Sequence, residues 1–306
     1  MYKKILFLLF IIILSGCVEI NLIKKTVINT EKVWLGSIDF SGYYNVEPIK
    51  NNPKLIWYFN NPPYPVPNTP FIYKPIFINS PLVYEGYVYF SDKDGNFYAL
   101  DEKNGNLIWK VHFENSYEIT TPTLANDIIF IGVCNLGIIG LNSKNGEIKF
   151  KLYNDDYFPA PPIIIDSMLY FLSIKPSWQH LNIYINAFNI EKSRYIYKRR
   201  FETNTKSPIF LISKESLVFY NEYIKSFLYN IDLKSGKIKW KKDIPNILNR
   251  TIPFDSNKIF IFTFNENLKL FTIDIDNGNI LCIKDISNNI IEPQNVLLVT
   301  DKNNLY

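Results

Sequence analysis

The feature that most constrains this sequence is a short motif that recurs with an almost constant period. An Asp or Asn is followed by a Gly four residues later and by an aromatic residue after another four. Strong copies begin at Asp101 (with Gly105 and Trp109), Asn142 (with Gly146 and Phe150) and Asp232 (with Gly236 and Trp240), and weaker copies at Asn189 (with Ser193 and Tyr197) and Asp274 (with Gly278 and Cys282). Their first positions are 41, 47, 43 and 42 residues apart. Such a period predicts one supersecondary unit per copy.

Each unit is typical of an antiparallel meander of short strands. Residues 83–90 and 97–100 are rich in β-branched and aromatic side chains, and Asp94 and Gly95 between them are typical of a hairpin turn. A proline, which can start a strand without breaking a ladder, opens each copy, at Pro81, Pro122, Pro162, Pro208, Pro253 and Pro293. We therefore predict an all-β fold, a β-propeller of about six four-stranded antiparallel blades.

The sixth copy begins at Pro293, and the sequence reaches Tyr306 before this copy has a motif of its own. The segment around Trp57 reads like the strand that contains Trp109, yet it has no preceding strands. We therefore expect an N-terminal strand near Trp57 to complete the last blade and close the ring, within a propeller domain of residues 53–306. The alternative is a chain that stops in the middle of a blade.

The N-terminal segment has the order of an export signal. Lys3 and Lys4 precede the apolar run 5–14, and Ser15 and Gly16 lead into Cys17. Ten apolar residues are too few to span a bilayer as a helix, which needs about twenty. The ending resembles the bacterial lipobox, in which the cysteine is acylated. We expect residues 1–16 to be a lipoprotein signal peptide and 17–52 a lipidated N-terminus and tether. The alternative is an ordinary secretory signal.

Charge and cysteine content exclude few classes of protein. The chain has 33 basic and 29 acidic side chains, and removing Lys3 and Lys4 with the signal peptide leaves 31 against 29, a net charge of +2. This balance argues against a nucleic-acid partner. Cys134 and Cys282 lie at non-equivalent places in the repeat, so pairing is not indicated. We expect buried free thiols in a monomeric propeller.

The sequence Ala99-Leu100-Asp101, with Gly105 and Trp109, resembles the pyrroloquinoline quinone repeat. In that family the Trp packs between neighbouring blades, which implies structural roles for the motif residues and for Trp57. Together with the lipobox at Cys17, the repeat resembles the BamB family of outer-membrane assembly lipoproteins, although that family has eight blades. The resemblance implies a periplasm-facing outer-membrane scaffold with protein partners in the β-barrel assembly machine.

Catalytic chemistry is not indicated by any motif. Enzymes of the quinone family add a calcium site, an aspartate base and often a vicinal cysteine pair, which this chain lacks. Asp92 to Gly95 is typical of a hairpin turn, and neither His112 nor His180 lies in a nucleophile or metal pattern. We predict no catalytic residue, metal site or cofactor, and a protein that is not an enzyme. The alternatives are a propeller that binds a quinone or another small ligand, as enzyme or sensor, and a lineage-specific envelope lipoprotein with another partner.

One departure from the repeat is a candidate contact with a partner. The long connection 174–181 accounts for the interval of 47 residues, and it contains Trp178 and His180. An exposed Trp is a common anchor of interaction surfaces. The alternative is a longer hairpin that folds back and buries Trp178.

Overall fold

The computed structural model is an all-β protein. It describes residues 18–20, 54–60, 64–65, 72–73, 80–116, 118–178, 180–203, 210–213, 215–222, 226–244, 246–247, 254–255, 257–264 and 267–285. The signal peptide, Cys17, most of the tether and the sixth copy from Pro293 lie outside these residues. Within the described part of the chain, no helix is long and apolar enough to span a membrane.

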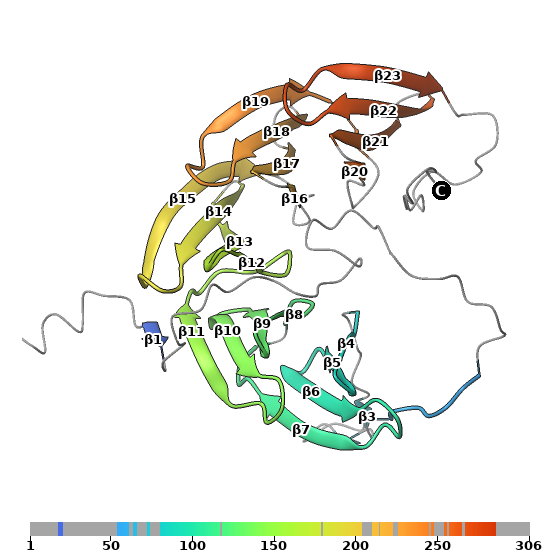
Figure 1. The fold of residues 1–306 in the computed structure, drawn as a ribbon, viewed down its shortest axis with the longest axis vertical. Coiled ribbons are helices and arrows are strands. Elements are labelled where there is room, and N and C mark those ends of the chain that lie inside the picture. The colour runs from blue at the N-terminus through green and yellow to red at the C-terminus, as the bar shows by residue number, and fades with distance from the viewer. Residues whose placement is uncertain are drawn as a thin grey trace, which may run out of the picture. The chain divides into compact units, whose positions relative to one another are not determined.

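Most strands form four-stranded antiparallel meanders in chain order (Figure 1). The first sheet contains β4 (Leu82–Tyr84), β5 (Tyr87–Ser91), β6 (Asn96–Asp101) and β7 (Leu107–His112). The second contains β8 (Thr123–Ala125), β9 (Ile128–Val133), β10 (Gly137–Asn142) and β11 (Ile148–Tyr153). To its outer edge β1 (Val18–Ile20) is added, antiparallel to β11.

Three more meanders follow. The third contains β12 (Ile163–Ile165), β13 (Met168–Pro176), β14 (Leu181–Asn189) and β15 (Arg194–Thr203). The fourth contains β16 (Phe210–Ser213), β17 (Ser216–Glu222), β18 (Ser226–Asp232) and β19 (Ile238–Asp243). The fifth contains β20 (Phe254–Asp255), β21 (Lys258–Phe264), β22 (Leu268–Asp274) and β23 (Ile280–Asp285). A separate two-stranded ladder joins β2 (Tyr64–Pro65) and β3 (Ile72–Tyr73).

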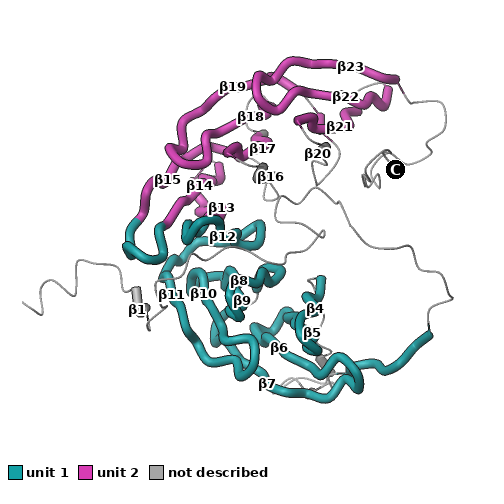
Figure 2. Tube along the Cα trace, in the orientation of Figure 1, with its two compact units in different colours: residues 1–31, 53–169, 189–194 teal, residues 32–52, 170–188, 195–306 magenta. Residues whose placement is uncertain are grey.

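The described residues divide into two compact units (Figure 2). The first unit contains the first and second sheets, and the second unit contains the fourth and fifth sheets. The third sheet contributes residues to both, since 170–188 and 195–203 belong to the second unit and the rest of that sheet to the first.

Each unit has its own apolar core between successive sheets. In the first, Tyr89, Phe97 and Trp109 of the first sheet lie in one buried cluster with Ile129 and Ile139 of the second. The inner strands are buried on both faces, as in β9, where every residue is buried. The outer strands alternate instead, as in β7. An apolar run thus marks an inner strand, and an alternating pattern marks an outer one.

In the second unit, buried residues of the fourth and fifth sheets form one cluster, which includes Val218, Leu228, Ile259, Ile261 and Ile273.

The prolines that were expected to open each copy lie at the starts of strands. The first strands of the first three sheets begin directly after Pro81, Pro122 and Pro162. The predicted antiparallel meanders are therefore confirmed.

The segment around Trp57 differs from its prediction in one respect. Residues 54–60 are described, but no strand is assigned to them. A strand requires a neighbouring strand with which to form a ladder, and the described residues provide none at this place. The segment is nevertheless ordered by side-chain packing, because Trp57 and Phe59 lie against the buried cluster of Phe90, Tyr98 and Leu100.

Candidate functional site

The repeated motif folds into the same turn in four sheets. The Oδ1 atom of Asp101 accepts hydrogen bonds from the backbone N–H groups of Lys103 (2.9 Å) and Asn104 (3.0 Å). The carboxylate or amide of Asn142, Asp232 and Asp274 likewise accepts bonds from the residues that follow it. A side-chain acceptor that closes a turn on its own backbone explains why the position is Asp or Asn.

The glycine of the motif completes this turn. The N–H of Gly105 donates to the carbonyl of Asp101 at 2.9 Å, and the equivalent bonds are present at the other three glycines. The backbone of Gly105 is left-handed, with φ of +72°. A residue with a Cβ adopts this conformation only with strain.

The aromatic residue of one sheet lies on the turn of the next sheet. Trp109 Nε1 donates to the carbonyl of Ser143 at 3.0 Å, and its ring packs against Gly146. Trp240 Nε1 donates to the carbonyl of Ile275 at 2.8 Å, and its ring packs against Gly278. In both cases the acceptor is the residue directly after the Asp or Asn of the motif, so the contact is part of the repeat.

Two further aromatic residues make the same contact. Trp57 Nε1 donates to the carbonyl of Glu102 at 2.7 Å, and a Cβ on Gly105 would lie 2.6 Å from Trp57 Cε3. The hydroxyl of Tyr197 donates to the carbonyl of Leu233 at 2.9 Å, and the Tyr197 ring lies on Gly236. Trp57 therefore makes the same contacts as Trp109 and Trp240, although its own segment is not a strand.

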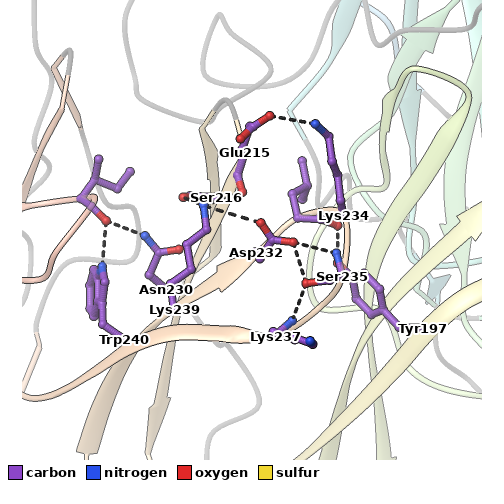
Figure 3. A network of polar contacts seen from close by, with 12 residues as sticks. Tyr197, Glu215, Ser216, Asn230, Asp232, Lys234, Ser235, Lys237, Lys239 and Trp240 are labelled. Atoms are coloured by element: carbon purple, nitrogen blue, oxygen red, sulfur yellow. Dashed lines mark hydrogen bonds and ion pairs between the residues drawn. The ribbon is translucent and has the colours of Figure 1, made fainter.

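Figure 3 shows the polar network around this turn in the fourth sheet. The hydroxyl and backbone N–H of Ser235 bind the Asp232 carboxylate, and Lys239 Nζ lies 3.8 Å from it. These groups hold the pKa of Asp232 below its ordinary value, the hydroxyl being the largest cause. Lys234 and Glu215 form an exposed ion pair beside it. This network stabilises the turn that carries the motif.

The copy of the motif that starts at Asn142 ends in Phe150 rather than in a tryptophan. Phe150 is fully buried and has no side-chain donor, so it cannot form the hydrogen bond that Trp109 forms. The glycine position of the next copy is Ser193, which still adopts a left-handed backbone with φ of +51°. The turn is thus kept even where the residue types of the motif are lost.

Asp92 and His112, which were considered as possible metal-binding or catalytic residues, form hydrogen bonds within the fold. The buried Asp92 carboxylate accepts bonds from the N–H of Asp94 and from both the backbone and the side chain of Asn96, as a hairpin turn requires. His112 Nδ1 lies 2.9 Å from Asn96 Oδ1. Among the described residues, no three His, Cys, Asp or Glu side chains are grouped so as to hold a metal ion.

Of the two free cysteines, Cys282 is exposed, which differs from the buried thiol that we expected.

The connection with Trp178 and His180 is the tip of a long hairpin formed by β13 and β14. Ser177 closes the tip, since its N–H and its hydroxyl both donate to the carbonyl of His180 at 2.9 Å. Trp178 is fully exposed, with a relative accessibility of 104%. His180 Nε2 lies 3.7 Å from Glu202 Oε1 on β15. Of the two alternatives for this hairpin, the structure has the one in which the Trp side chain points into solvent.

A comparison with models of protein families identifies the family to which this chain belongs. A family model described as outer membrane protein assembly factor BamB matches residues 73–242, more than half of the chain. The chain belongs to the BamB family. BamB of Moranella endobia is 22% identical over 205 residues, which cover 62% of this chain and 50% of that protein. Tetrathionate hydrolase of Acidithiobacillus ferrooxidans is 22% identical over 223 residues, 68% of this chain and 42% of that protein. The chain thus spans about half the length of these curated relatives.

Solved structures show the fold. BamB of Moraxella catarrhalis matches with a TM-score of 0.54 at 14% identity, covering 77% of this chain and 71% of that chain. Quinohemoprotein alcohol dehydrogenase of Comamonas testosteroni matches with 0.53 at 12% identity, covering 68% and 43%. A europium-containing methanol dehydrogenase matches with 0.51 at 11% identity, covering 67% and 50%. The predicted propeller and its quinone-type repeat are confirmed, whereas six blades and a closed ring stay predictions.

These comparisons overturn one prediction. We predicted that the chain is not an enzyme, because no catalytic motif accompanies the repeat. The curated relatives of this BamB-family chain include a hydrolase, and the solved structures that share its fold include two dehydrogenases. The prediction was wrong because it treated the repeat without a recognisable motif as typical of scaffolds, while the same blades also form the body of enzymes.

Proposed function

We propose that this protein is a lipid-anchored propeller of the cell envelope that acts as a scaffold for protein assembly at the outer membrane. The observation that carries the proposal is the match of the BamB family model over residues 73–242. The interblade contacts support it, because a body held together by repeated indole hydrogen bonds is a rigid platform for loops that meet partners.

The proposed anchor is the acylated side chain of Cys17, after removal of residues 1–16. Several acyl chains hold a protein to a bilayer firmly, since each buried methylene contributes about 0.8 kcal/mol. Residues 17–52 then form the tether, and residues 53–306 form the propeller. We place the protein at the outer membrane, facing the periplasm, as a monomer whose partners belong to the β-barrel assembly machine.

Affinity capture from detergent-solubilised envelopes tests this function. The tagged chain and its Cys17→Ser variant are purified in parallel, and the co-purified proteins are identified by mass spectrometry. Recovery of β-barrel assembly components with the unsubstituted chain supports the scaffold function. Repeated recovery of an unrelated envelope partner would instead favour a lineage-specific lipoprotein. The mass of the N-terminal peptide reports acylation of Cys17 independently of the partner.

A second candidate function is an enzyme or sensor that binds a small molecule. The observation in its favour is the similarity to tetrathionate hydrolase, which extends over 68% of this chain. Native mass spectrometry of the purified protein, with and without tetrathionate or pyrroloquinoline quinone, tests this function. A stoichiometric mass increase, or turnover of tetrathionate, would support the enzyme over the scaffold.

A further inference from the structure

The second sheet has a strand that the other meanders lack. β1 lies antiparallel to β11 at the outer edge of this sheet. The register pairs Val18 with Leu152, Glu19 with Lys151 and Ile20 with Phe150. Among the described residues, the other four meanders end at their own outer strands. β1 and the second sheet belong to the same compact unit, so the added strand is a feature of that unit and not of the repeat.

The residue types of the two strands match at this register. The apolar positions of β1 stand opposite Leu152 and Phe150, which are buried in the second sheet, and the acidic position stands opposite Lys151. Cross-strand pairs of apolar residues and of opposite charges stabilise a sheet. A slip by one residue would instead place Glu19 opposite a buried apolar residue. The sequence of β1 therefore favours the register that the structure has.

Lys151 differs from the lysines at the same place in other outer strands. This position holds Lys110 in β7, Lys198 in β15 and Lys241 in β19, and each Nζ lies 3.5 to 5.2 Å from the centroid of an aromatic ring of its own sheet. The residue of β10 that pairs with Lys151 is Ile139, which offers no ring. A lysine on an edge strand ordinarily discourages the addition of another strand. Because β1 has an acidic residue at the opposing position, the edge of β11 selects a strand of this composition.

The chain direction brings the proposed anchor to one end of this edge. Since the strands are antiparallel, β1 begins opposite the end of β11 that leads to Tyr153. Cys17 precedes Val18 by one peptide unit, which spans about 3.8 Å between Cα atoms. Tyr153 is 57% exposed, and Tyr is enriched at the level of the lipid headgroups in membrane proteins. An acyl group on Cys17 would thus begin within one residue of the sheet.

We infer that the outer edge of β11 is the docking site of the lipidated N-terminus, so that the acyl chains on Cys17 leave the second sheet beside Tyr153 and hold this sheet at the bilayer surface. This inference rests on the proposed function, because that function supplies the acyl chains. A free tether of residues 17–52 would reach up to roughly 120 Å from the bilayer. The docked strand instead keeps one end of the second sheet at the headgroups, and it thereby defines which part of the protein faces the membrane.

Disulfide cross-linking in the acylated full chain tests the docking. Every cysteine except Cys17, which the acyl group blocks, is first replaced by Ala. Glu19→Cys with Lys151→Cys is the test pair, and Glu19→Cys with Lys149→Cys is the matched control, because position 149 lies on the same face of β11 two residues away. We expect the test pair to oxidise at least about fivefold faster, since cysteines more than about 7 Å apart are bridged only when the chain moves. Equal rates would overturn the docking.

Charge reversal gives a second measurement on the chain with Cys17→Ser. We expect Glu19→Lys to speed hydrogen exchange of the β11 backbone about fivefold, because like charges then stand opposite each other. Lys151→Glu in the same chain should restore the protection, which a general loss of stability would not allow. Exchange of β11 that is the same in the Glu19→Lys and unsubstituted chains would contradict the docking.

Spin labels on the acylated chain test the contact with the bilayer. In vesicles of phosphatidylethanolamine and phosphatidylglycerol, a label at Tyr153→Cys should be several times more accessible to lipid-dissolved oxygen than a label at Ile148→Cys. Ile148 is the matched control, because it is also exposed but lies at the other end of β11, roughly 16 Å away. Equal accessibility would overturn the bilayer contact. An unacylated Cys17, seen in the mass of the N-terminal peptide, would contradict the proposed function alone, because cross-linking in the Cys17→Ser chain reports docking without acyl chains.

Discussion

Gly146 lies against the indole ring of Trp109, so closely that a Cβ on Gly146 would come within 2.7 Å of Trp109 Cε3. The two residues belong to successive sheets, and their contact is repeated by Trp57 with Gly105 and by Trp240 with Gly278. Glycine is therefore required at this position of the motif for two reasons: the aromatic ring leaves no room for a Cβ, and the backbone has a positive φ. Mutations can separate these two effects.

We expect Gly146→Ala to lower the free energy of unfolding by about 3 kcal/mol, from a left-handed backbone and an overpacked ring. Gly86 is the matched control, because its φ is +83° but nothing lies within 4 Å of the added methyl. Gly86→Ala should cost about 1 kcal/mol. Urea unfolding of the two variants measures the difference. Equal losses would show that the Trp109 ring moves aside without cost.

The carbonyl of Ile275 accepts hydrogen bonds from both Trp240 Nε1 and Asn230 Nδ2. We expect Trp240→Phe and Asn230→Leu each to cost about 1 to 2 kcal/mol, because one donor remains in either case. The double variant should lose about 1 kcal/mol more than the sum, since a buried acceptor is then left without these donors. A double-mutant cycle by urea unfolding measures this coupling. Trp240→Phe combined with Asp101→Ala, two residues with no shared hydrogen-bond partner in the described structure, should be additive.

The lowered pKa of Asp232 predicts a pH dependence of stability. A carboxyl group whose pKa is lower in the folded state stabilises the fold above its unfolded pKa, about 4, and this contribution is lost as the pH falls through the folded pKa. In Asp232→Asn, the amide oxygen still closes the turn, as Asn142 does. We expect the unsubstituted chain to be more stable than the variant near pH 7, and we expect this advantage to decrease as the pH falls below about 4 and to vanish only below the folded pKa. Unfolding curves across this range test it, and a constant difference would contradict the assignment.

The two cysteines of the propeller should react at different rates with a thiol reagent. Cys282 is exposed, whereas Cys134 is partly buried, and burial raises the pKa of its thiol. The thiolate is the reactive form, so we expect Cys134 to react more slowly at pH 8. In a Cys17→Ser background, Ellman's reagent should show two phases, and Cys282→Ala should remove the fast one. Loss of the slow phase in that variant would contradict the assignment.

The repeat was readable from sequence because local geometry restricts its residue types. Asp101 must accept bonds from its own turn, and Gly105 must adopt a positive φ, so both leave a pattern in the sequence. The role of Tyr197 was harder to predict, because a phenol replaces an indole at the same place. The constant position of the acceptor carbonyl leaves no pattern at all, since every residue type has a carbonyl group.

The candidate functional residues were less predictable than the fold. The sequence shows that the segment with Trp178 departs from the repeat. The exposure of Trp178, however, depends on how the hairpin closes. Ser177 closes it through hydrogen bonds to the carbonyl of His180, which cannot be predicted from the sequence pattern. Catalytic capacity could not be read from the blades, because scaffolds and enzymes are built on the same core.

The contact between an indole and the next turn has a consequence for how such chains diversify. Trp109, Tyr197 and Trp240 are encoded 37 to 39 positions before the glycines that they cover, so a DNA segment that runs from one of these aromatic residues to its glycine contains a donor ring at one end and an acceptor turn at the other. Duplication or deletion of that segment joins compatible surfaces without new mutations. We therefore expect the number of blades to change more readily than the residues of the motif.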